Sequence, residues 1–293
     1  MIRSLRRKVG RCQTGARLLL FLIGLVLTGC SSTQFAYNQL DTLILWKSGD
    51  YVDLTSEQRT WLRSEVNAFL DWHREEELPR YSQWLFQAEL SLDEPLTERR
   101  VAALMIPFDL ALDRLQIRIY DLLFRGASLL TAEQTADLLA TLRDDQGDLE
   151  RELLARDETE YREDTYERLE SQMARVLGRL SPEQKARLQQ ASADIARIDH
   201  LWLQDRSRWQ ADLEQMITEK PNQWPIAASA YFAGDKTLST PEYQALWQHN
   251  TAVITRASVA VLTQRSARQD RHLRRWLSDL RDDFDALAAA SVQ

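Results

Sequence analysis

The sequence predicts an all-α protein, a single bundle of about seven or eight helices that follows a cleaved signal peptide. Glycine and proline are scarce, with 9 and 7 among 293 residues, which is too few for a turn-rich β-sandwich or a disordered chain. A helix-start pattern also recurs along the chain, and apolar residues near these starts follow helical spacing. Because no linker interrupts residues 54–293, we expect them to form one helical domain.

Residues 1–29 have the organisation of a secretory signal peptide. Six basic residues and no acidic residue precede an uncharged apolar run from Leu18 to Thr28. That run is about half of the ~20 residues that a membrane-spanning helix needs. The tetrapeptide Leu27-Thr28-Gly29-Cys30 then resembles the bacterial lipobox, in which the cysteine thiol receives a diacylglyceryl group. The alternative is a buried cysteine at the end of an ordinary signal peptide.

The lipobox resemblance implies a lipid anchor and a location. Cys30 would carry a diacylglycerol and an N-acyl chain, and three such chains hold a protein firmly because each buried methylene contributes about 0.8 kcal/mol. Ser31, and not an aspartate, follows the cysteine. By resemblance to lipoprotein sorting, this residue implies the periplasmic face of the outer membrane. We expect residues 30–53 to form the lipid anchor and a first short helix.

Composition excludes several classes of function. Removal of the signal peptide leaves 31 basic against 44 acidic residues, a net charge of −13, which disfavours nucleic-acid binding. Cys30 is then the only cysteine, so we expect no disulfide, thiol nucleophile or cysteine-bound metal. The sequence contains no nucleophile elbow, phosphate-binding loop or dinucleotide fingerprint. We therefore expect no enzymatic activity, no metal and no cofactor apart from the covalent lipid.

The helix starts share one pattern, in which Leu precedes Thr or Ser and Gln follows three residues later. It occurs at Leu54, Leu130 and Leu180, and looser versions begin at Leu96 and Leu238. The hydroxyl caps a backbone N–H, and the glutamine helps to satisfy the first turn. The expected helices cover residues 56–78, 80–90, 98–123, 132–177, 182–217, 242–262 and 267–287. We expect Pro79 to end helix 56–78 and Pro107 to kink helix 98–123. Helix 132–177 is expected to be interrupted near Gly147 and to end at Gly178 as its C-cap. Residues 221–241 are expected to be irregular.

The densest group of polar side chains surrounds His73. His73 borders the apolar face of its helix, and Glu76 and Glu77 are within reach of its imidazole. One interpretation is a general acid or base, or half of a metal site. The other is a hydrogen-bond network in which His73, Arg74 and Glu77 tie the helix to its neighbour. No spaced second histidine accompanies His73, which favours the network.

This segment resembles the hallmark of an uncharacterised family of Gram-negative lipoproteins, described only as a domain of unknown function. The residues that carry the resemblance are Trp72, His73, Arg74, Leu78, Pro79 and Tyr81. It implies a helical architecture and outer-membrane attachment, and it provides no catalytic residue. A second resemblance, to the Spy/CpxP periplasmic stress proteins with their LTxxQ strings, implies a chaperone for unfolded clients. Ordinary helix caps account for the same strings.

Two further sets of residues are candidate contact surfaces. Residues 256–281 hold seven arginines and two aspartates, and Arg268, Arg271 and Arg275 could dock an acidic partner such as lipopolysaccharide phosphates. The alternative is that this run pairs with the acidic stretch 144–170 on a neighbouring helix. Trp224, Tyr231 and Phe232 form either a contact loop or an aromatic plug for the bundle.

Together these patterns predict an outer-membrane lipoprotein without catalytic activity, which acts through helix-surface contacts with an envelope protein or lipopolysaccharide. A Spy-like chaperone and an enzyme that uses His73 with an acidic neighbour remain the alternatives.

Overall fold

The computed structural model describes residues 30–220, 222–234 and 240–290, and within these ranges the chain is all-α, without a strand. The predicted signal peptide lies outside the described residues. The helices are α2 (Cys30–Asn38), α3 (Leu40–Ser48), α4 (Ser56–Trp72), the π-helix η1 (His73–Glu77), α5 (Leu78–Leu90), the 3-10 turn η2 (Ser91–Asp93), α6 (Glu98–Ala127), α7 (Ala132–Ala155), α8 (Glu158–Leu177), α9 (Pro182–Asp194), α10 (Asp199–Glu219), α11 (Trp224–Gly234), α12 (Pro241–Thr263) and α13 (Ala267–Ala289).

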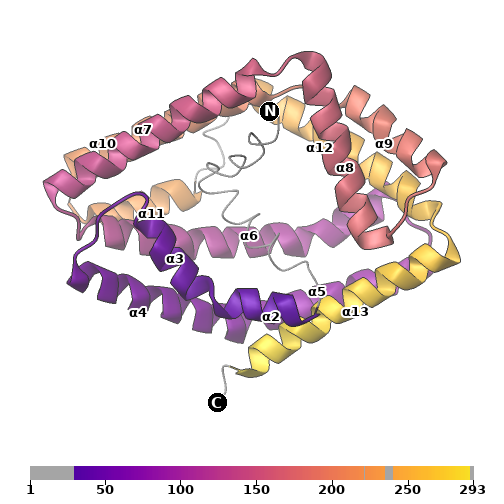
Figure 1. Cartoon of the computed structure of the whole chain (residues 1–293), viewed down its shortest axis with the longest axis horizontal. Coiled ribbons are helices and arrows are strands. Elements are labelled where there is room, and N and C mark those ends of the chain that lie inside the picture. Colours follow the sequence, from indigo (N-terminus) through magenta and orange to yellow (C-terminus); the bar gives the residue numbers. More distant parts are fainter. Residues whose placement is uncertain (1–29, 221, 235–239, 291–293) are drawn as a thin grey trace, which may run out of the picture.

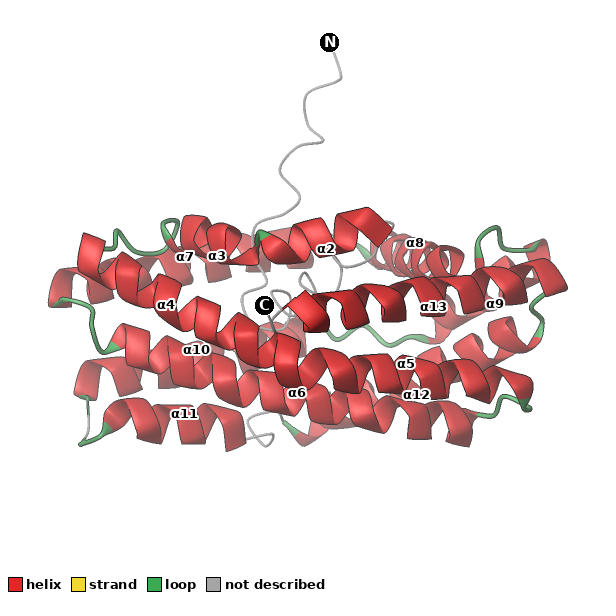
Figure 2. Cartoon of the chain, turned by 90° about the horizontal axis from the view of Figure 1, so that it is seen from below, coloured by secondary structure: helices red, strands yellow, loops and turns green. Residues whose placement is uncertain are grey.

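The helices form a closed, elongated frame (Figure 1). Helices α4, α5 and α13 follow one long side, and α7 and α10 follow part of the other. Seen from the side, α2 and α3 lie at one face and α11 and α12 at the opposite face (Figure 2). The described part of the chain contains no helix that is both apolar and long enough to cross a bilayer.

The predicted count of seven or eight helices is wrong. Eleven are present in the described residues when α4, η1 and α5 are counted as one continuous helix. Two of the predicted long helices are each broken into two, and the segment predicted to be irregular contains a helix. Specific polar contacts explain the two breaks, and apolar packing explains the additional helix.

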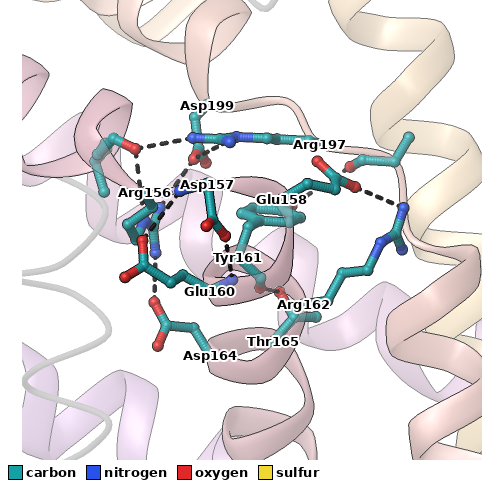
Figure 3. A network of polar contacts seen from close by, with 12 residues as sticks. Arg156, Asp157, Glu158, Glu160, Tyr161, Arg162, Asp164, Thr165, Arg197 and Asp199 are labelled. Atoms are coloured by element: carbon teal, nitrogen blue, oxygen red, sulfur yellow. Dashed lines mark hydrogen bonds and ion pairs between the residues drawn. The ribbon is translucent and has the colours of Figure 1, made fainter.

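The predicted helix 132–177 breaks at Arg156 and not near Gly147, which lies inside α7. Asp157 caps α8, and its carboxylate accepts from the Glu160 N–H at 2.9 Å. Arg156 donates to both Asp164 and Asp199 at 2.9 Å (Figure 3). The capping box and the arginine that binds both aspartates stabilise a turn between α7 and α8. The chain therefore changes direction here and does not continue as one helix.

The predicted helix 182–217 breaks between Asp194 and Asp199. The buried Asn250 side chain of α12 binds both backbone groups of Ala196: it accepts from the N–H and donates to the carbonyl, each at 2.8 Å. An amide that satisfies both groups replaces the helical hydrogen bonds lost at the break. A residue 54 positions away therefore determines this corner.

The segment predicted to be irregular over 221–241 contains α11, which packs against α6. Trp224 and Phe232 are buried in an apolar cluster with Phe124 and Ile217, whereas Tyr231 remains exposed. The Phe124 and Phe232 rings stack at 5.3 Å. Trp224 and Phe232 therefore belong to the core of the bundle.

The three full Leu-Thr/Ser patterns do begin helices, with complete capping boxes at α4, α7 and α9. Their glutamines also pair. Gln58 of α4 and Gln134 of α7 exchange amide hydrogen bonds of 2.9 Å. Gln184 of α9 forms a similar pair with Gln269 of α13. The same string that starts a helix therefore also joins it to a second one. The starts of α4 and α7 lie at one end of the frame, and those of α9 and α13 lie at the other (Figure 1).

Candidate functional site

An apolar cavity of about 640 Å³ lies between α5, α6 and α13, and residues of α2, α3, α4 and η1 also line it. Its walls are aliphatic and aromatic along most of their length. Trp84 and Leu85 come from α5, Leu104 and Phe108 from α6, and Leu280 from α13. Volume and lining are typical of a site for a small apolar ligand.

The cavity exists because α6 packs closely on α11 but has few contacts with α5, which packs on α13. Trp84 spans the gap, and its indole N–H donates to the Leu104 carbonyl at 2.6 Å. Pro107 follows within the same turn of α6 and lacks the N–H that would bind the Ala103 carbonyl. Despite Pro107, α6 continues as one helix to Ala127.

The floor of the cavity contains the π-helix η1, where the sequence predicted the end of a helix. The Leu78 N–H donates to the His73 carbonyl, one residue further than in an α-helix. Pro79 then occupies the first turn of α5, where a missing N–H is tolerated. The prediction that Pro79 ends the helix is therefore wrong, because the wider turn accommodates the proline. That turn places His73 and Tyr81 beside one another at the cavity wall, with Glu77 buried between them in the sequence.

His73 is enclosed by aromatic rings. Its centroid lies 5.5 Å from Tyr81 and 5.7 Å from Tyr37, and its Nδ1 shares a 2.9 Å hydrogen bond with the Tyr37 hydroxyl. Burial lowers the pKa of His73 from 6.5 to about 4, and Arg74 lowers it further, whereas Glu77 opposes the shift. Burial likewise raises the pKa of Tyr37. At neutral pH the imidazole is therefore uncharged.

Glu77 is fully buried and paired with two arginines. Arg114 of α6 donates to both of its oxygens, at 2.6 and 2.8 Å, and Arg80 donates at 2.7 Å. Burial alone would raise the pKa of Glu77, but the hydrogen bonds and charges of Arg114 and Arg80 outweigh burial and hold this pKa below its ordinary value. The bidentate pair ties η1 to α6.

The other motif residues hold the same region together. The Arg118 guanidinium lies 4.4 Å from the Trp72 ring centroid, and the Arg74 guanidinium lies over the Tyr37 ring and donates to Asn38. Leu78 is buried in the cluster that contains Tyr37 and Leu287. The buried Tyr81 hydroxyl lies near Glu77, which adds to the effect of burial in raising its pKa, and it makes no hydrogen bond of normal geometry in the described chain.

This geometry favours the network interpretation of the motif. A catalytic pair would need a carboxylate free to accept a proton from the imidazole. Glu77 instead neutralises Arg114 and Arg80, and His73 binds Tyr37. Among the described residues, no group of three or more histidines, cysteines and acids is placed to hold a metal ion.

Two important members of this region, Tyr37 and Arg114, were not predicted from the sequence. They lie 36 and 37 residues from their partners His73 and Glu77. Neither carries a local signal, since a lone tyrosine and a lone arginine occur on many helices. The cavity was missed as well, because it depends on the separation of α5 and α6.

The arginine surface on α13 is divided between paired and exposed residues. Arg274 binds Asp270 and Asp93, and Arg281 binds Glu89, so these arginines pair with η2, α5 and their own helix and not with the acidic stretch 144–170. Arg268, Arg271 and Arg275 are exposed. Their spacing of three and four residues places them on one face of α13.

Comparison with known proteins gives one match. A family model described as a family of unknown function (DUF6279) matches residues 50–244, which include η1, α5 and α6 but not α2, α3 or α13. No curated protein and no solved structure matches the chain.

Proposed function

The chain belongs to the DUF6279 family of unknown function, and we propose that it is a lipoprotein without catalytic activity, anchored through Cys30 at the periplasmic face of the outer membrane. It acts there through contacts with another component of the envelope. The lipobox resemblance at Leu27-Thr28-Gly29-Cys30 and the following Ser31 support the anchor and its location.

The observation that carries this proposal is the exposure of aromatic side chains on α2, which begins at Cys30, and on α3, which follows it. Phe35 and Trp46 are 70% and 67% exposed, whereas Tyr37 and Leu40 of the same segment are buried. Exposed aromatic residues beside a lipid anchor suit the interface between water and lipid, where the amphipathic indole of tryptophan is favoured and an apolar phenylalanine ring can enter the acyl region. Helices α2 and α3 lie at one face of the molecule (Figure 2), so this face would rest on the bilayer.

Metabolic labelling with alkyne-tagged palmitate tests the anchor. We expect the wild-type chain to carry the label and to fractionate with outer membranes, and Cys30→Ser to lose both properties. Cys12→Ser is the matched control, because Cys12 lies in the segment that is removed. Label retained by Cys30→Ser, or an unlabelled wild-type chain, contradicts the proposal. Ser31→Asp should move the labelled chain to the inner membrane.

The alternatives are less well supported by the geometry. Two glutamines of the LTxxQ strings, Gln58 and Gln134, bind each other and backbone carbonyls, so packing explains the strings without a client protein. A chaperone would nevertheless suppress aggregation of a denatured protein at stoichiometric amounts, which a light-scattering assay measures. The catalytic alternative conflicts with the paired state of Glu77.

A further inference from the structure

We propose that the cavity between α5, α6 and α13 binds the long acyl chain of an amphiphile, with the polar head of the amphiphile at the rim beside Arg80 and Arg114. This inference goes beyond the proposed anchor and does not depend on it, because the cavity is formed by side chains alone. Close-packed interiors contain few voids larger than a water molecule. A cavity of about 640 Å³ with an opening to solvent is large enough to admit a ligand.

The lining excludes polar ligands. The central wall consists of residues such as Leu104, Phe108, Leu115, Trp276 and Leu280, which offer no hydrogen bonds to a ligand apart from the Trp276 N–H. A bound peptide would bury its backbone N–H and C=O groups here without partners, at a large cost in free energy. A sugar or a nucleotide would bury still more polar groups. An acyl chain has none along its length.

The dimensions favour a chain over a compact ring system. Cavity-lining residues extend along α6 from Ala103 to Ile119, a distance of about 24 Å at the rise of an α-helix. On the facing helix, α5, the cavity-lining residues extend from Leu78 to Ala88. A volume of about 640 Å³ spread along this length is long and narrow, which suits a flexible hydrocarbon chain.

The rim provides an apolar entrance and polar groups beside it. Leu110 lines the cavity and is 52% exposed, and its neighbours Met105 and Ile106 are exposed as well. Arg80 and Arg114 also line the cavity and are partly exposed, and both bind the carboxylate of Glu77. Guanidinium groups at the rim can donate hydrogen bonds to the polar head of an amphiphile whose chain lies in the cavity.

Photo-cross-linking in cells tests the inference on the full-length protein. The probe is a palmitate analogue with a diazirine in the chain and a terminal alkyne. We expect ultraviolet-dependent adducts on peptides of α5, α6 or α13, mapped by mass spectrometry. Label on Cys30 needs no light, so it reports on the anchor separately, and either result can fail without the other. Adduct masses separate a free fatty acid from a phospholipid.

Cavity-filling variants provide the decisive comparison. Ala111 is buried and lines the cavity, so Ala111→Trp should reduce the light-dependent adducts at least fivefold. Ala102→Trp is the matched control, since Ala102 is exposed on the same helix and does not line the cavity, and it should retain them. Ala88→Trp on the facing wall repeats the test if Ala111→Trp melts at a lower temperature.

Three results would overturn the inference. One is labelling of Ala111→Trp and Ala88→Trp at the wild-type level when both are folded. Another is a set of adducts scattered over exposed surfaces. The third is a cross-link from the cavity to the acylated Cys30 peptide alone, which would identify the protein's own anchor as the occupant.

Discussion

Gln184 and Gln269 join the first turns of α9 and α13 by hydrogen bonds between their side-chain amides, at 2.7 and 3.3 Å. Each oxygen also accepts from its own N-cap, Ser181 or Ser266, at 2.9 Å. Each nitrogen donates to a backbone carbonyl, that of Val261 or Arg179. All polar atoms of both buried amides are therefore satisfied, and two helix ends are fixed to each other.

We expect Gln184→Ala to destabilise the protein by about 2–3 kcal/mol, because it leaves the buried Val261 carbonyl without its side-chain partner and removes both hydrogen bonds between the two amides. Gln58→Ala, at the more exposed pair, should cost about 1 kcal/mol. Urea unfolding followed by circular dichroism measures both values. Gln189→Ala, at an exposed site on α9, is the control and should change stability by less than 0.5 kcal/mol.

A double-mutant cycle shows whether the pair acts as a unit. The combined loss in Gln184→Ala/Gln269→Ala should fall short of the sum of the single losses by at least about 0.5 kcal/mol. Additive losses would mean that each glutamine only caps its own helix.

These pairs show what local sequence can predict and what it cannot. The Thr55 and Thr131 caps were predicted from four-residue strings, because a capping box is a local structure. The boxes at Asp157 and Ser266 carry the same local signal, with Glu160 and Gln269 three residues later, and were nevertheless missed. The partner of each glutamine lies 76 or 85 residues away, and no local string specifies it.

The candidate site shows the same division. The sequence identified His73, Arg74 and Glu77 as members of a network because they fall on adjacent turns of one helix. Their partners Tyr37 and Arg114 come from other helices. Pro79 misled the prediction, since the rule that a proline ends a helix does not consider a π-turn that accommodates it. The cavity depends on packing between helices and has no sequence pattern of its own.

Gly147 offers a test of the α7 assignment. It lies inside the helix, and a Cβ added there meets no atom within 4 Å. Gly147→Ala should therefore stabilise the protein by about 0.5–1 kcal/mol through helix propensity, measured by thermal or urea unfolding. Gly126→Ala is the matched comparison, because its Cβ would lie 3.0 Å from the Trp61 ring, so the crowding offsets the same gain. A destabilised Gly147→Ala variant would contradict a continuous α7.

Glu77 and Glu76 form a second matched pair, as neighbours that both bind Arg80. Glu77→Gln should cost about 3 kcal/mol, because it removes the charge that compensates Arg114 in a buried site. Glu76→Gln, at an exposed ion pair of 3.4 Å, should cost less than about 0.5 kcal/mol. Equal effects of the two substitutions on the urea midpoint would show that Glu77 is not held in the bidentate pair.

His73 should make stability depend on pH in a defined window. Its pKa is lowered from 6.5 to about 4 in the folded state, so the unfolded chain binds the proton more readily between these values. The stabilisation is complete above pH 6.5 and is lost as the pH falls toward 4. The hydrogen bonds and charges of Arg114 and Arg80 hold the pKa of Glu77 below its ordinary value as well, against the effect of burial.

A comparison with His73→Phe isolates this contribution. The variant keeps an aromatic ring among Tyr37, Phe69 and Tyr81 but cannot be protonated. The advantage of the wild type over the variant in free energy of unfolding should therefore shrink by about 2 kcal/mol between pH 7 and pH 4.5. Urea titrations at half-unit pH steps measure it. An advantage that stays constant across this range would mean that His73 takes up a proton as readily in the folded protein as in the unfolded chain, and the imidazole would then be available for the acid–base role that its burial argues against.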